Sequence, residues 1–325
     1  MNRETPDPIF VFRGARSPVA SLTFLKAAED GFVYSLAAGT QEGQLLIWDL
    51  KSKCIIKDFP AHPASSILWL HSESPNELWT LGRHDKVKCW DIGQQVPYVR
   101  AEYSLSDYLG FSQCHMITVN SVSLLAIPGP SMEGVTVYDA QKRVKICTLS
   151  PKDPKKSGTL MQMQWVNEMP NIYLLVAYES GHLSLWDHNE GNILSEIQFS
   201  DNPICFSYNP VTRIGILGST SEKIFVFNID ADLRLHKKED VIITNPGVGS
   251  CVDRPDGKIF VAGGWDFRIR FFSSKKMKPL AVLMYHKKTV RCLAYSPSFV
   301  KSLECEFLLA AGSDDMSVSL WNLFN

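Results

Sequence analysis

The chain has 325 residues, 45% of them apolar, and a formal net charge of −1 at pH 7. This length allows two ordinary domains or one large β architecture. The near-zero charge argues against broad electrostatic capture of nucleic acid or of an anionic membrane surface. No stretch reaches the ~18 consecutive apolar residues of a membrane-spanning helix. Residues 1–8 are polar and contain proline, so we expect a short tail there and no secretory signal.

The first predicted element is a short strand over residues 9–12, with the sequence Ile-Phe-Val-Phe. Its apolar residues favour a strand that precedes the first complete structural repeat. Residues 13–19, with the sequence Arg-Gly-Ala-Arg-Ser-Pro-Val, follow it and are similar to the loop and first inner strand of such a repeat.

One short pattern then recurs seven times along the chain. Alternating apolar residues lead to an aromatic residue, which is followed by a polar residue, most often Asp or Asn. The steps between the aromatic residues are 42, 48, 48, 41, 45 and 49 residues. WD-repeat blades have periods of ~40–45 residues with insertions in surface loops, so seven occurrences are a specific signal. The aromatic residues are Trp48, Trp90, Tyr138, Trp186, Phe227, Phe272 and Trp321.

An apolar strand and a glycine-rich, acidic turn precede the aromatic strand in several repeats. Residues 32–38 lead into such a turn at 39–43, and residues 307–311 lead into one at 312–315. Glycine allows a positive φ angle, and acidic side chains bond to nearby turn amides. Alternation with short turns predicts antiparallel strands, and no long window indicates an amphipathic helix. The sequence therefore predicts an all-β fold, a seven-bladed WD-repeat β-propeller.

The last blade needs a strand from elsewhere in the chain. A propeller must join its first and last blades, because an open edge strand exposes unpaired backbone groups. The sequence ends at Asn325, just after Trp321, so the last blade lacks its outermost strand. We expect residues 9–12 to complete this blade, so that residues 9–325 form a single seven-bladed β-propeller behind the tail of residues 1–8.

The chain resembles WD-repeat proteins over essentially its whole length from Ile9. In that family a His, a Ser or Thr, an Asp and the Trp of one blade often form a structural chain of hydrogen bonds. His286, Asp315 and Trp321 match this motif, but Ala311 occupies the strand position of the Ser or Thr, which implies an incomplete chain of bonds. The other residues that match structural positions are Trp48, His62, Trp90, Trp186 and Asp266.

In repeat number and closure the chain also resembles the β subunits of heterotrimeric G proteins. Those subunits carry a long N-terminal helix that coils with the γ subunit, whereas only residues 1–8 precede the first predicted strand here. We therefore expect no γ subunit among the partners of this chain.

Several sequence blocks point to a narrower resemblance. They are residues 7–14 with 17–19, residues 244–247 with 254–256 and 262–270, and residues 279–283 with His286. These blocks resemble the family of guanine nucleotide-binding protein subunit beta-like protein 1, also called ASTRA-associated protein 1. The resemblance implies a non-enzymatic scaffold associated with the TTT co-chaperone complex, which assists the maturation and stability of phosphatidylinositol-3-kinase-related kinases.

The sequence contains no motif of a catalytic or cofactor site. It has neither a phosphate-binding Gly-x4-Gly-Lys-Ser/Thr loop nor a Gly-x-Ser-x-Gly nucleophile elbow. The eight histidines and eight cysteines show no paired metal-ligand spacing. We therefore expect no enzymatic activity, no cofactor and no metal. The scattered cysteines are typical of a reduced protein of the cytoplasm, the nucleus or both.

WD-repeat propellers commonly bind partners through the face that carries the turns between their second and third strands. Trp265 is the main candidate there, because tryptophan and arginine are enriched in interface hot spots. Two interpretations of Trp265 stay open: it contacts a partner, or it packs over its own blade. The further candidates on this face are Arg83, His84, Tyr178 and Arg268.

Three classes of function remain to be distinguished. The first is the chaperone-linked protein scaffold that the family resemblance implies. The alternative is a WD-repeat substrate-recognition or assembly subunit of a ubiquitin-ligase or chromatin complex. An enzyme with its site in the central channel is the third class, but it would need convergent acidic or metal-ligating residues, and the sequence shows no such set.

Overall fold

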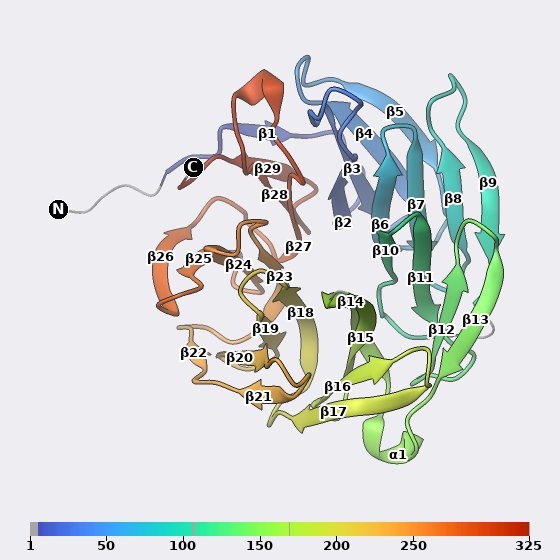
Figure 1. Cartoon of the computed structure of the whole chain (residues 1–325). Helices are drawn as coiled ribbons and strands as arrows, with labels where there is room; N and C mark the ends of the chain where they lie inside the picture. Colours follow the sequence, from blue (N-terminus) through green and yellow to red (C-terminus); the bar gives the residue numbers. More distant parts are fainter. Residues whose placement is uncertain (1–5, 106–107, 169, 325) are drawn as a thin grey trace. The chain divides into compact units, whose positions relative to one another are not determined.

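The computed structural model describes residues 6–105, 108–168 and 170–324. Its strands form seven antiparallel sheets, which are the seven blades of the predicted all-β propeller (Figure 1). The chain divides into two compact units, one formed by Met1–Tyr103 with Gly247–Asn325 and the other by Ser104–Pro246.

The first unit contains blades one, two, six and seven. Blade one consists of β2 (Val19–Phe24), β3 (Ser35–Thr40), β4 (Gln44–Asp49) and β5 (Ile55–Pro60). Blade two consists of β6 (Ile67–Ser74), β7 (Glu77–Gly82), β8 (Val87–Asp91) and β9 (Tyr98–Tyr103). Blade six consists of β23 (Val248–Asp253), β24 (Ile259–Gly264), β25 (Ile269–Ser273) and β26 (Lys278–Leu283). Blade seven contains β27 (Val290–Tyr295), β28 (Leu309–Ser313) and β29 (Val318–Trp321), with the short helix η1 (Lys301–Leu303) between the first two.

The fourth strand of blade seven comes from the N-terminal end of the chain. Strand β1 (Phe10–Phe12) pairs antiparallel with β29, with Phe10 opposite Leu320 and Phe12 opposite Val318 (Figure 1). The amide of Ile9 donates a further hydrogen bond of 2.9 Å to the carbonyl of Leu320. Phe12 is buried and stacks on Trp48 of blade one, with ring centroids 5.1 Å apart. The predicted closure by residues 9–12 is confirmed.

The second unit contains blades three, four and five. Blade three consists of β10 (His115–Val119), β11 (Val122–Pro128), β12 (Val135–Asp139) and β13 (Val144–Leu149). The short helix α1 (Pro154–Ser157) leads to blade four, which consists of β14 (Leu160–Glu168), β15 (Asn171–Tyr178), β16 (His182–Asp187) and β17 (Asn192–Gln198). Blade five consists of β18 (Pro203–Asn209), β19 (Ile214–Ser219) and β20 (Lys223–Ile229), with β21 (Leu235–Lys237) and β22 (Val241–Ile242) both paired to β20.

The repeated aromatic residues sit at a repeated irregularity of the sheets. In five blades the register between the third and fourth strands shifts just before the aromatic residue, as it does between Ile47 and Trp48 and between Leu185 and Trp186. A bulge of this kind bends the strand and redirects its side chains. The repeated aromatic residue therefore marks the place where the fourth, outer strand of the blade bends away from the inner strands.

The apolar cores lie between consecutive blades within each unit. Strand β4 is buried at all four of its central residues, whereas the outer strand β5 alternates between exposed and half-buried residues. This difference arises because inner strands are covered on both faces and the outer strand faces solvent. One core joins blades seven and one around Phe12 and Trp48, and another joins blades four and five around Phe206 and Phe227.

Two glutamines connect blades four and five in the second unit. The side-chain amide of Gln162 donates to the carbonyl of Phe206 at 2.9 Å, and its oxygen accepts from the amide of the same residue at 2.7 Å. Gln164 makes the same pair of bonds with Tyr208, at 2.8 and 2.9 Å. Each primary amide thus pairs with a backbone as a neighbouring strand would, which satisfies the edge of β18. We call these contacts the glutamine clamps.

Candidate binding face

Blade two contains a complete chain of hydrogen bonds among His62, Thr80, Trp90 and Asp85. The ring nitrogens of His62 lie 2.6 Å from the Asp85 carboxylate and 2.6 Å from the Thr80 hydroxyl. The indole N–H of Trp90 donates to the same hydroxyl at 3.0 Å. Burial lowers the pKa of His62 to about 4, so the ring is neutral at pH 7. Its Nδ1–H then donates to the carboxylate, and its Nε2 accepts the hydroxyl proton of Thr80.

Blade seven contains the corresponding chain, with a different source for its hydroxyl. His286 lies 2.9 Å from the Asp315 carboxylate and 2.8 Å from the hydroxyl of Ser319, which accepts from Trp321 at 2.7 Å. The expectation that this chain is incomplete was wrong. Ser319 stands directly opposite Ala311 in the sheet, so the neighbouring strand supplies the hydroxyl that strand β28 lacks.

In blade six an arginine of the third strand, and not a histidine, pairs with the carboxylate of the turn. Arg270 is 4% exposed and donates to both carboxylate oxygens of Asp266, at 2.9 and 2.5 Å. A bidentate guanidinium–carboxylate pair holds the turn in the same way as a histidine–carboxylate pair. The two other tryptophans matched to the motif, Trp48 and Trp186, are buried in the interblade cores.

Trp265 lies on the turn between β24 and β25, where its ring packs over its own blade and is also partly exposed. Its ring covers the start of β23, because a Cβ atom added to Gly247 would come within 2.3 Å of the ring. The amide of Trp265 also donates to the carbonyl of Gly247 at 3.0 Å. The residue is nevertheless 43% exposed. Arg268 on the same turn is half-buried, with its guanidinium 3.8 Å from Asp266.

The other candidates divide between the two units. His84 is exposed and Arg83 is half-buried on the turn between β7 and β8 of blade two. Tyr178, in the second unit, is only 1% exposed, so the prediction that it lies on a binding surface was wrong. It is the last residue of β15, and its ring packs into the core that contains Trp186, where burial raises the pKa of its hydroxyl.

Sequence reasoning missed three exposed apolar residues at the same end of blades six and seven. Phe267 and Met316 lie on the turns after β24 and β28, with 43% and 39% of their surface exposed. Met284, between β26 and β27, is 61% exposed. A comparison of the turns in the sequence could have pointed to Phe267 and Met316. Blade one has glycine, Gly43, at the equivalent turn position, where these blades have a large apolar residue.

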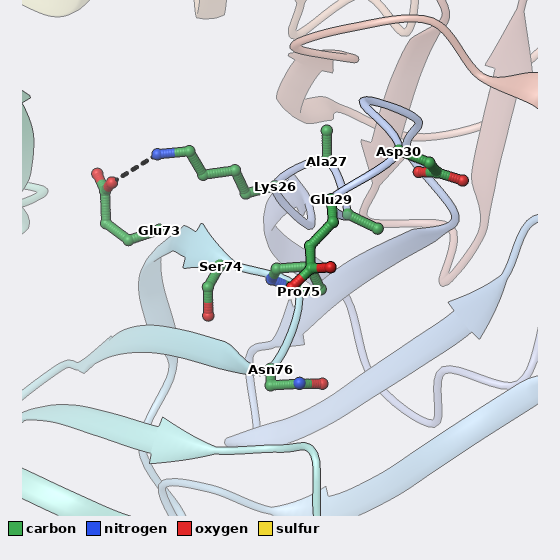
Figure 2. Close-up of a pocket in the computed structure, with 9 residues that line it drawn as sticks. Lys26, Ala27, Glu29, Asp30, Glu73, Ser74, Pro75 and Asn76 are labelled. Carbon is green, nitrogen blue, oxygen red and sulfur yellow. Dashed lines mark hydrogen bonds and ion pairs between the residues drawn. The ribbon is translucent and has the colours of Figure 1, made fainter.

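A pocket of about 810 Å³ lies in blades one and two, at the ends of the strands that are away from the turns between second and third strands. Lys26 and Glu73 form an ion pair of 2.9 Å at its side (Figure 2). Burial alone raises the pKa of Glu73, but hydrogen bonds from His71 and Lys26 outweigh it and lower the pKa to about 2. A carboxylate that stays ionised at neutral pH does not serve as a general acid there. The remaining lining residues are Ala27, Ala28, Glu29, Asp30, Ser74, Pro75 and Asn76.

Within the described part of the chain, no group of three or more His, Cys, Asp or Glu side chains is placed to hold a metal ion. Over the same residues, no helix has the length and apolar character needed to cross a membrane.

Known proteins share both the repeat and the full length of this chain. The family described as "WD domain, G-beta repeat" matches residues 240–273 and 277–322. Guanine nucleotide-binding protein subunit beta-like protein 1 of Mus musculus is 31% identical over 324 residues, which cover 98% of this chain and 97% of the mouse protein. ASTRA-associated protein 1 of Schizosaccharomyces japonicus is 26% identical, over 98% of this chain and 99% of the yeast protein. The chain therefore belongs to the WD-repeat family of guanine nucleotide-binding protein subunit beta-like protein 1.

Proposed function

We propose that this chain is a non-enzymatic scaffold that binds protein partners and acts in the cytoplasm, the nucleus or both. The partners proposed are the TTT co-chaperone complex and the phosphatidylinositol-3-kinase-related kinases, whose maturation and stability the chain would assist. The observation that carries the proposal is the end-to-end similarity to proteins named ASTRA-associated protein 1. The half-exposed ring of Trp265, held on a turn of blade six, supports a binding surface on this chain.

Affinity purification of the tagged chain, expressed at its natural level, tests the partners. Subunits of the co-chaperone complex and the kinases themselves should dominate the co-purified proteins. Depletion of the chain should lower the steady-state amounts of these kinases without lowering their messenger RNA. Recovery of ubiquitin-ligase or chromatin subunits in their place would reject the proposal in favour of the alternative adaptor.

Substitution of the candidate face tests where partners bind. We expect Trp265→Ala and Arg83→Ala to reduce the co-purified proteins while the melting curve stays unchanged. Val96→Ala is a matched control, because Val96 is 76% exposed on a loop of blade two at the other end of strand β8. Undiminished co-purification by both variants of the candidate face would reject this surface.

A further inference from the structure

Four turns between second and third strands share one backbone geometry. In each, the amide of the third turn residue donates to the carbonyl of the last strand residue, and this third residue has a positive φ angle. Blades one and four place glycine there, at Gly43 with φ 84° and Gly181 with φ 89°. Blades six and seven place Phe267 with φ 71° and Met316 with φ 65° at the same position.

Large side chains at this position are unfavourable for the chain by itself. A positive φ angle brings a Cβ atom close to the backbone, which glycine avoids. Burial of the side chain could offset that cost, but Phe267 and Met316 remain 43% and 39% exposed. Strained residues that gain little packing are characteristic of functional surfaces.

Two further exposed apolar residues lie at the same end of these adjoining blades, Trp265 and Met284. A core shared by blades six and seven joins Phe271 to Trp321, which holds the two blades together. Trp265 covers Gly249, where an added Cβ atom would lie 3.3 Å from the carbonyl of Val290 in blade seven. We call the exposed side chains on these turns the blade 6–7 patch. It consists of Trp265, Phe267, Met284 and Met316.

The charged groups beside the blade 6–7 patch that have no ion-pair partner among the described residues are the ammonium groups of two lysines. The backbones of Lys287 and Lys288 are fixed to the blade-seven turn by bonds to Asp315 at 3.1 Å and to the Ser313 hydroxyl at 3.0 Å. Both lysines are exposed, and the structure gives their ammonium groups no ion pair with any residue that it describes. The turn carboxylates, in contrast, are already bonded to cationic or histidine side chains. The pairs are Asp266 with Arg270, Asp314 with Arg291 and Asp315 with His286.

We propose that the blade 6–7 patch binds an acidic segment of a protein partner that also carries aromatic or branched aliphatic side chains. The apolar side chains of the segment pack on Trp265, Phe267 and Met316, and its carboxylates pair with Lys287 and Lys288. An apolar centre with unpaired charge at its rim selects a partner that has both features. This inference rests on the proposed function, because it names the chemistry of the partner that the scaffold holds.

Fluorescence anisotropy with three synthetic peptides on the full chain tests this chemistry. The first peptide has about twelve residues, in which Asp and Glu alternate with Phe and Leu. The second replaces the acids with Lys, and the third replaces Phe and Leu with Ser. We expect the first to bind at least about tenfold more tightly than either of the others, with an affinity that falls as ionic strength rises.

Two pairs of variants place the binding on this patch. Phe267→Gly with Met316→Gly should weaken the first peptide at least about tenfold, while the melting temperature does not fall, because glycine relieves the strained backbone. Lys287→Glu with Lys288→Glu should weaken it by a similar factor. The matched control is Lys275→Glu with Lys276→Glu, an exposed lysine pair on the turn at the opposite end of β25, which should leave the affinity unchanged.

The possible outcomes separate this inference from the proposed function. Equal affinity for the three peptides, or no effect of either patch variant, would overturn the inference even if Trp265→Ala still released co-purified proteins. Binding of an RNA oligonucleotide or of anionic phosphatidylserine vesicles in preference to the acidic peptide would overturn it as well. If the tagged chain recovers no specific protein at all, the proposed function itself is wrong.

Discussion

The two compact units solve the same problem, the burial of polar groups in stacked sheets, by different chemistry. In the first unit, blades two and seven place a histidine between a carboxylate and a hydroxyl, as His62 and His286 show. In the second unit, the glutamine clamps of Gln162 and Gln164 satisfy backbone groups of the next blade. Each histidine chain lies within one blade and contains a titratable ring. The glutamine clamps join two blades and carry no titratable group, so the two sets of contacts should respond differently to acid and to substitution.

Removal of the N-terminal strand should have the largest effect, and it acts on the first unit. Deletion of residues 1–12 removes the partner of β29 and the buried ring of Phe12. We expect a loss of at least about 5 kcal/mol in the free energy of unfolding, or failure to fold, since a buried phenylalanine alone contributes about 3–5 kcal/mol. Chemical denaturation measures the effect, with deletion of residues 1–8 as the control. A variant without residues 1–12 that melts as the whole chain does would refute the closure.

Loss of the central hydroxyl should have the next largest effect. Thr80→Val leaves the ring of His62 and the indole of Trp90 without their common partner. Each buried group left unpaired costs about 1–3 kcal/mol, so we expect a destabilisation of about 2–4 kcal/mol by denaturant titration. Thr148→Val, on the exposed face of β13 in the second unit, is the control and should change stability by less than about 0.5 kcal/mol. Equal destabilisation by Thr80→Val and Thr148→Val would show that the hydrogen-bonded motif does not stabilise blade two.

Acid should weaken the first unit through His62. Burial lowers the folded-state pKa of this residue from its ordinary value of 6.5 to about 4. The unfolded chain then binds the proton more readily, so the stabilising contribution is complete above pH 6.5 and is lost as the pH falls toward 4. At pH 5 the loss should be about 2 kcal/mol. Denaturant titrations at pH 7 and 5 measure it. A His62→Gln variant should be less stable at pH 7 but lose less on acidification, and an equal loss in both proteins would exclude His62 as the cause.

The smallest effect is expected at the glutamine clamps. Gln164→Leu removes two hydrogen bonds to Tyr208 at a half-buried site, which water can partly replace. We expect a loss of about 1 kcal/mol and faster hydrogen exchange of the Tyr208 amide, with no dependence on pH beyond that of the exchange chemistry. The amide of Phe206, held by Gln162, is the internal control. Unchanged exchange at Tyr208 would show that the clamp does not restrain β18.

The architecture was predictable from the sequence because each repeat carries its own local signals. Aromatic strands at a regular spacing and glycine-rich turns determine the blades, and the strand missing after Trp321 predicted the pairing of β1. The hydroxyl of blade seven was expected at Ala311 and judged missing, because only the register of the sheet shows that Ser319 stands opposite that residue. Thr80 and Asp85 were not singled out, although His62 and Trp90 matched the other two positions of the motif.

The candidate site was harder to predict than the fold. The exposure of a side chain near a strand end depends on whether the residue still lies within the strand or on the turn that follows. Tyr178 and Trp265 both follow an apolar run, yet the first is buried and the second is 43% exposed. The turn of blade six lies after Gly263 and Gly264, so its tryptophan stands one position beyond the strand, whereas Tyr178 is still within β15. The glutamine clamps join residues of different repeats, and a pattern within one repeat does not reveal such contacts.

The pairing of β1 with β29 also has a consequence for the order in which the protein is made. During synthesis Phe10, Val11 and Phe12 leave the ribosome long before their partners in β29, because Phe10 pairs with Leu320 and Phe12 with Val318. Until β29 has been made, β1 therefore remains an apolar segment without its sheet, and blade seven cannot form. Contacts of such long sequence separation form slowly and leave aggregation-prone strands exposed in the meantime. The propeller therefore closes only after its last blade has been made, and β1 stays exposed to aggregation until then.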